Sequence, residues 1–160
     1  MNDTPLNDDL RDLYQDLILD HGKHPRNFRV LDGANREALG HNPLCGDRLV
    51  LSLKVDADNV VRDAAFQGSG CAISTASASM MTEMLKGRSV AEVEKLFDYF
   101  HALCTGATPS AEGVAADDVE RLNALAGVRH YPVRVKCATL AWHTLRNALV
   151  PSDEKKASTE

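Results

Sequence analysis

The stretch that decides the fold is residues 47–74, DRLVLSLKVDADNVVRDAAFQGSGCAIS. It opens with apolar and polar side chains in alternation, which is typical of a half-buried strand. The apolar members are Leu49, Leu51, Leu53 and Val55. Residues 57–59 indicate a turn, and residues 60–67 the returning strand of a hairpin. Beyond the glycines at 68 and 70 the apolar spacing becomes helical, so we expect a helix to follow the hairpin directly.

Helical spacing dominates the chain after this hairpin. Four helices are expected there, each marked by a residue that starts or stops a helix. The markers are Gly87 at the end of the first, the capping box of Ser89 and Glu92 at the start of the second, Asp117 at the start of a short third, and Pro132 and Pro151 around the last. Residues 106–116 are small and turn-rich, which indicates an exposed loop.

Before the hairpin, the spacing of leucines predicts a helix from Leu6 to Ile18 that ends near Gly22. Weaker patterns suggest short strands at 28–31 and 37–39. Strands early and helices late predict an α+β fold with a small antiparallel sheet packed against helices.

The chain length of 160 residues is that of one domain. We therefore expect a single domain over residues 1–150 and a polar, disordered tail over residues 151–160.

The charge balance narrows the class of partner. The chain carries 18 basic and 23 acidic side chains, a net charge of −5, which argues against nucleic acid or an anionic membrane as the main partner. No apolar run is long enough for a transmembrane helix. The first ten residues are polar and acidic, unlike a secretory signal or a transit peptide. We therefore expect the protein in the cytoplasm, where thiols stay reduced.

The four cysteines differ in their local backbone. Cys45 lies in a turn-forming loop, and Cys71 and Cys137 lie near helix starts, where unpaired amides favour a thiolate. Cys104 falls near the end of an amphipathic helix, so a structural role is expected for it. Asp47 follows Cys45 by two residues. Three thiolates and this carboxylate would suit zinc or an iron–sulfur cluster.

The spacing of the cysteines is also compatible with roles that involve no metal. Buried cysteines are commonly unreactive, and the chain has no Cys-x-x-Cys pair. Cys71 at a helix start also resembles the nucleophile of a Cys/His hydrolase, although no partner for it stands out. None of the six histidines indicates a metal ligand by itself.

Three motifs, in order along the chain, resemble those of a known family. They are Asn42-Pro-Leu-Cys-Gly-Asp47, Gly68-Ser-Gly-Cys-Ala-Ile-Ser74 and Arg134-Val-Lys-Cys-Ala-Thr-Leu-Ala-Trp142. Together they resemble the SufU branch of the IscU/NifU-type iron–sulfur assembly proteins, and the resemblance runs from about Leu10 to about Leu149. In IscU-type scaffolds a histidine directly precedes the third cysteine, whereas this chain has Lys136 there. That departure, and an extra stretch around residues 104–126, point to the SufU branch.

The resemblance implies a function and a set of site residues. Its metal ligands would be Cys45, Asp47, Cys71 and Cys137, and the metal would be Zn²⁺, with an iron–sulfur cluster as the alternative. Cys137 is the expected acceptor of persulfide sulfur from a SufS-type cysteine desulfurase, and downstream iron–sulfur assembly proteins would be further partners. Two other hypotheses remain, a scaffold that builds and transfers a cluster and a purely structural zinc domain.

Overall fold

The computed structural model describes residues 16–43, 46–127, 132–149 and 156–158. Its sheet contains β1 (Arg36–Asn42), β2 (Asp47–Val55), β3 (Val61–Ser69) and β4 (Lys156–Ser158), in the order β3-β2-β1-β4. The first three strands pair antiparallel, and β4 pairs parallel to β1. The expected α+β fold is confirmed.

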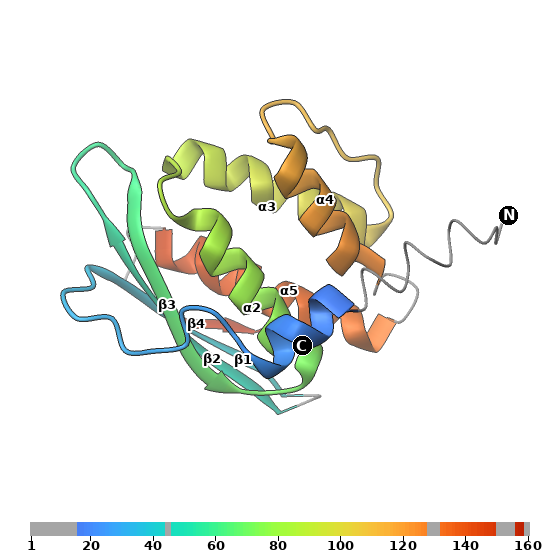
Figure 1. Ribbon diagram of the computed structural model, residues 1–160, viewed down its shortest axis with the longest axis horizontal. Coiled ribbons are helices and arrows are strands. Elements are labelled where there is room, and N and C mark those ends of the chain that lie inside the picture. The colour runs from blue at the N-terminus through green and yellow to red at the C-terminus, as the bar shows by residue number, and fades with distance from the viewer. Residues whose placement is uncertain (1–15, 44–45, 128–131, 150–155, 159–160) are drawn as a thin grey trace, which may run out of the picture.

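Helices cover one face of this sheet (Figure 1). Residues 16–23 are helical, and the helices that follow are α2 (Ala72–Leu85), α3 (Val90–Thr105), α4 (Ala116–Leu125) and α5 (Pro132–Leu149). α2 contacts β3, and α5 contacts β1 and β2, whereas α3 and α4 pack on these two helices as an outer layer. No helix of the described ranges is both long and apolar enough to cross a membrane.

The core forms where the hairpin meets α2 and α5. The inward side chains of β2 are buried as its alternation predicts, and Leu51 and Leu53 are completely so. Burying a leucine contributes about 1.5–3 kcal/mol. Trp142 of α5 and Phe100 of α3 are also buried, with ring centroids 5.2 Å apart. The hairpin therefore supplies one wall of the core and the helices the other.

Most helix boundaries agree with the sequence signals. The capping box of Ser89 and Glu92 is formed at the start of α3, and Gly106 ends that helix in the left-handed conformation. α4 begins one residue before Asp117, and α5 begins at Pro132 and ends at Leu149, before Pro151. The helix predicted from Leu6 to Ile18 lies mostly outside the described residues.

Three strand predictions need correction. Residues 28–31 do not form a strand, because only Phe28 pairs with β3, through an isolated bridge to Phe66. The strand predicted at 37–39 exists but spans seven residues as β1. β3 continues past residue 67, where the predicted strand ended, through Gly68 and Ser69. A Cβ on Gly68 would collide with the carbonyl of Arg48, so only glycine fits this pairing.

The polar tail contributes a strand, against the expectation of disorder. Lys156–Ser158 extends the sheet as β4 beside β1. Its three residues carry a single apolar side chain, Ala157, which is too few for a strand pattern to be recognised in the sequence.

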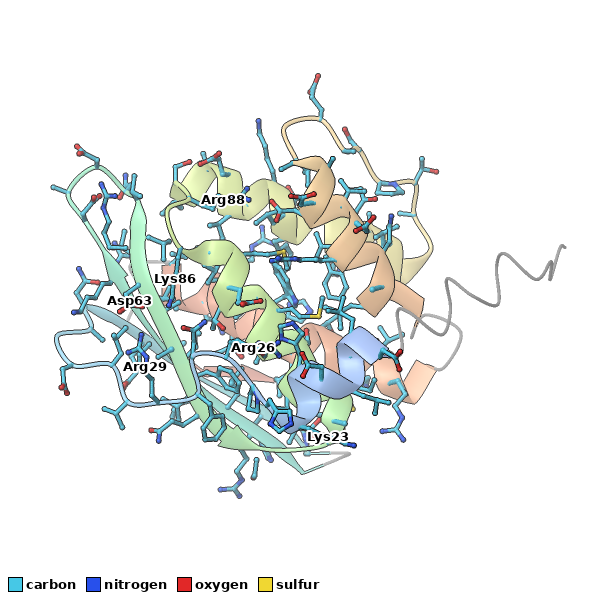
Figure 2. The ribbon with its side chains drawn as sticks, in the orientation of Figure 1. Lys23, Arg26, Arg29, Asp63, Lys86 and Arg88 are labelled. Atoms are coloured by element: carbon cyan, nitrogen blue, oxygen red, sulfur yellow. The ribbon has the colours of Figure 1, made fainter. Side chains whose placement is uncertain are left out.

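Polar contacts attach residues 21–29 to α2 and β3. Ser79 of α2 bonds the buried His21 ring (Oγ to Nδ1, 2.7 Å) and accepts the backbone N–H of Arg26 (2.8 Å). Asp63 of β3 accepts a hydrogen bond from Arg29 (3.0 Å) and forms an ion pair with Lys86 (3.4 Å), and Figure 2 shows these three side chains converging. The segment that leads into β1 is thereby held along the edge of β3.

Candidate metal centre

Three potential metal ligands that are distant in the sequence meet at one end of the sheet. Asp47 is the first residue of β2, Cys71 is the N-cap of α2, and Cys137 lies in the second turn of α5. One ligand atom from each lies within 4.8 Å of the other two. In the described part of the chain this is the one group of three or more such side chains. The fold thus assembles part of the site that the motifs implied.

Asp47 has a buried carboxylate that a bound cation would stabilise. Its side chain is completely buried. Oδ1 accepts the backbone N–H of Cys71 (3.1 Å), but Oδ2 is buried and finds no hydrogen-bond donor among the described residues. A buried carboxylate oxygen without a partner costs about 1–3 kcal/mol or more. A metal ion bound to Oδ2 would remove that penalty.

Cys71 is partly exposed and oriented for ligation. As the N-cap of α2, its sulfur accepts the backbone N–H of Ser74 (N to Sγ, 3.5 Å). Cys71 thus lies at the N-terminal end of α2, where backbone N–H groups without helical partners face its sulfur.

Gly70 makes room for this arrangement. A Cβ on Gly70 would stand 2.5 Å from Oδ1 of Asp47. Because glycine lacks that atom, the backbone before Cys71 can approach the carboxylate closely enough for the hydrogen bond to form. The sequence indicates this glycine only as a turn residue, and its place directly before Cys71 is the one signal of its further role.

Cys137 approaches the group from the interior. It is completely buried, whereas the flanking Lys136 is partly exposed and Arg134 is exposed. These two cations lie on the same helical turns as the thiol. The site therefore has a buried side, formed by Asp47 and Cys137, and an accessible side, formed by Cys71.

The other candidates divide into two groups. Cys45 lies outside the described residues, and so does His130. Cys104 is buried in α3 within the hydrophobic core and does not belong to the metal-ligand group, as expected. His41 lies on β1, opposite Arg48, and is likewise not in the group.

The donor set fits zinc. Two thiolates and a carboxylate are ligands that Zn²⁺ takes in tetrahedral sites, and a fourth position remains for one more donor. The same thiolates also suit an iron–sulfur cluster. Hard cations such as Mg²⁺ are disfavoured because they prefer an all-oxygen shell.

Comparison with known families agrees with this geometry. The model of the NifU-like N terminal domain matches residues 13–138. The chain belongs to the NifU-like N-terminal domain family. This IscU/NifU membership confirms the resemblance that the three motifs suggested.

Members of the NifU-like family with different names are equally similar to this chain. It is 40% identical over 151 residues to the iron–sulfur cluster assembly scaffold protein IscU of Streptococcus pyogenes serotype M1, covering 94% of this chain and 91% of that protein. It is also 40% identical over 147 residues to the zinc-dependent sulfurtransferase SufU of Bacillus subtilis, covering 92% and 96%.

A solved structure of the family has the same fold. The putative iron–sulfur cluster assembly scaffold protein for the SUF system from Fervidobacterium islandicum AW-1 superposes with a TM-score of 0.77 at 29% identity, covering 88% of this chain and 98% of that one. Family membership thus rests on sequence and fold together.

Proposed function

We propose that this chain is an iron–sulfur cluster assembly protein of the SUF type, a zinc-dependent acceptor of sulfur from a cysteine desulfurase. The observation that carries the proposal is the buried Asp47 carboxylate, which offers one oxygen within 4.8 Å of the sulfurs of Cys71 and Cys137 and whose Oδ2 finds no hydrogen-bond donor among the described residues. The relative named as a zinc-dependent sulfurtransferase, 40% identical over nearly the whole chain, supports the choice of zinc.

The proposed ligands are Cys45, Asp47, Cys71 and Cys137. Zinc, when bound, supplies a redox-inactive Lewis acid that keeps its sulfur ligands deprotonated. The protein side of the site is already arranged, since Asp47 is oriented by the N–H of Cys71 and Cys71 by the N–H of Ser74. Cys45 would add the third thiolate.

Cys137 is the proposed sulfur acceptor. Its thiolate attacks the outer sulfur of a persulfide on the desulfurase, the sulfur–sulfur bond of that persulfide breaks, and the desulfurase cysteine leaves as a thiolate. The reaction transfers one sulfur atom and its proton, and needs no external oxidant or reductant. Arg134 and Lys136 would stabilise the attacking thiolate. Because Cys137 is buried, its helical turn must open for the attack.

The partners and the compartment follow from this chemistry. A persulfide donor of the SufS type would act before this protein, and iron–sulfur assembly proteins would receive the sulfur after it. Thiols that must stay reduced fit the cytoplasm.

A cluster scaffold is the second candidate. The IscU-named relative is as similar as the SufU-named one, and the same thiolates can hold a cluster. Lys136 disfavours this alternative, because it stands where IscU-type scaffolds carry a histidine and its ammonium group cannot ligate iron.

The test is the metal content and sulfur-acceptor activity of protein purified without oxygen. We expect one zinc per chain, no visible absorption, and strong stimulation of a SufS-type desulfurase. Cys137→Ala should abolish sulfur acceptance, whereas Cys104→Ala should retain it. A brown protein that passes a cluster to an apo-acceptor would favour the scaffold, and full sulfur acceptance by Cys137→Ala would contradict the assignment.

A further inference from the structure

Ser77 connects the helix of Cys71 to the helix of Cys137. It is completely buried in α2. Its hydroxyl donates to the backbone carbonyl of Ala138 (2.6 Å) and accepts the indole N–H of Trp142 (3.1 Å). Ala138 directly follows Cys137, and Trp142 lies one turn farther along α5. A single side chain therefore joins the two cysteine-bearing helices just behind the metal centre.

Packing alone does not account for a hydroxyl at this position. The neighbours of Ser77 in α2 are Ala76 and Ala78, both also buried, so an alanine would suit the local surface. A buried hydroxyl costs free energy unless it is hydrogen-bonded, and here both of its bonds go to α5. Hydrogen bonds are directional, whereas apolar contacts between helices tolerate sliding and rotation.

The two hydrogen bonds of Ser77 affect the position of the Cys137 thiol relative to Cys71. Cys71 sits at the first residue before α2, and Ser77 is six residues farther on. On α5 the bonded carbonyl belongs to the residue next to Cys137. A shift of α5 along or around its axis would move Cys137 away from Cys71 and Asp47, and such a shift must break the bonds of Ser77.

We propose that Ser77 is a positioning residue of the metal centre, which fixes α5 on α2 and so holds the Cys137 thiol at ligating distance from Cys71 and Asp47. This inference rests on the proposed function only for the identity of the metal that the thiols bind. The hydrogen bonds by which Ser77 positions α5 do not involve a metal. Their loss frees the turn of Cys137, which lowers metal retention and raises the exposure of that thiol.

The experiment compares Ser77→Ala with Ser79→Ala. Ser79 is a matched control, since it lies on the same helix, is completely buried, and also has two hydrogen bonds, but to His21 and Arg26. The first measurement is the rate of iodoacetamide alkylation at each cysteine of the zinc-free protein, read by mass spectrometry. Cys104, buried in α3, reports global unfolding in the same sample.

We expect Ser77→Ala to raise alkylation of Cys137 about tenfold relative to Cys104, because two hydrogen bonds are lost. Ser79→Ala should leave this ratio unchanged. A second measurement, zinc transfer to a chromophoric chelator, should be about tenfold faster for Ser77→Ala only. Trp142 is the only tryptophan of the chain, so its emission spectrum should also shift in Ser77→Ala and not in Ser79→Ala.

The outcomes separate this inference from the proposed function. Equal Cys137-to-Cys104 ratios in the two variants would overturn the positioning role, whatever metal the protein binds. If the wild-type chain retains no zinc, the zinc proposal fails, and the alkylation ratio of the metal-free protein still decides the role of Ser77.

Discussion

At the scale of single residues, Asp47 is unfavourably placed unless a cation joins it. Oδ1 is satisfied by the N–H of Cys71, and Oδ2 has no described donor although it is buried. The charge therefore contributes little to folding by itself, and a bound cation would compensate it. The family motif indicated Asp47 as a ligand, but only the structure shows that one oxygen is hydrogen-bonded to the backbone and that the other has no donor among the described residues.

The first prediction concerns Asp47→Asn. The amide retains the Oδ1 acceptor and removes the negative charge, so affinity for zinc should fall by about tenfold or more. Stability of the zinc-free protein should not fall, because an uncompensated buried charge has been removed. Chelator competition and urea denaturation with and without zinc measure the two quantities.

A matched control for this variant is Asp58→Asn, at an exposed position in the β2–β3 turn. It should change neither quantity measurably. If Asp47→Asn lowered the stability of the zinc-free protein while zinc affinity stayed intact, Asp47 would be a structural residue and not a ligand.

At the scale of elements, the junction of β3 and α2 decides whether the ligands meet. β3 ends at Ser69 and α2 starts at Ala72, so the two intervening residues must turn the chain and pass Asp47. The second prediction is that Gly70→Ala lowers zinc affinity roughly tenfold, and stability by about 1–3 kcal/mol, because the new methyl group displaces the carboxylate.

Gly127→Ala is the control for this substitution, since no atom of the described residues beyond its chain neighbours lies within 4 Å of a Cβ built there. Isothermal titration with zinc and urea denaturation measure both variants. Wild-type zinc affinity in Gly70→Ala would show that Asp47 does not need the clearance that glycine provides.

A helix or strand could be predicted from the sequence where the signal for it lies within the element itself. β2 and α3 are predictable because alternation, the capping box and Gly106 are local signals. The strand predicted at 28–31 is wrong because its apolar side chains Phe28 and Val30 remain 44% and 67% exposed, and the backbone pairs with β3 only once. β4 pairs with β1, a strand far earlier in the chain, and no local signal reports such a pairing.

The contact between residues 21–29 and α2 yields the third prediction. Burial is the main cause that lowers the pKa of His21 below its ordinary value of 6.5, and the charge of Arg26 adds to it, against Glu83 and Asp20. The unfolded chain therefore takes up this proton at higher pH than the folded chain. Stability should be complete above about pH 6.5 and should fall as the pH drops from there toward the folded pKa.

Urea denaturation at about pH 7.5, 6.5 and 5.5 tests this. His21→Gln should flatten the decline in part, because burial lowers the pKa of His143 as well and that residue remains. The carboxylates with lowered pKa, such as Asp63, add their losses only at lower pH. An identical decline in His21→Gln and wild type would contradict the role of His21.

At the scale of the whole molecule, the site exists because three segments that are far apart in the chain end at the same place. The order and chemistry of Cys71 and Cys137 were readable from the sequence, as was the exclusion of Cys104. Their proximity was not, because gaps of this length carry no distance information. It depends on how α5 packs across β1, β2 and α2, a tertiary arrangement that only the family motifs could imply.

This dependence leads to the last prediction, that zinc joins β2, α2 and α5 and stabilises the whole domain. Any ligand that binds only the folded state adds stability, and at one hundred times its dissociation constant it adds about 2.7 kcal/mol. For a domain of this size, removing zinc with a chelator should lower the melting temperature by about 5–10 °C. The measurement is calorimetry of the wild-type chain with and without chelator. In Cys71→Ser the shift should shrink strongly, because the least buried of the three described ligands is then weakened, whereas Cys104→Ala should keep it. If the chelator left the melting temperature of the wild-type chain unchanged, the three segments would be held by packing alone. The centre would then not bind zinc in the folded protein.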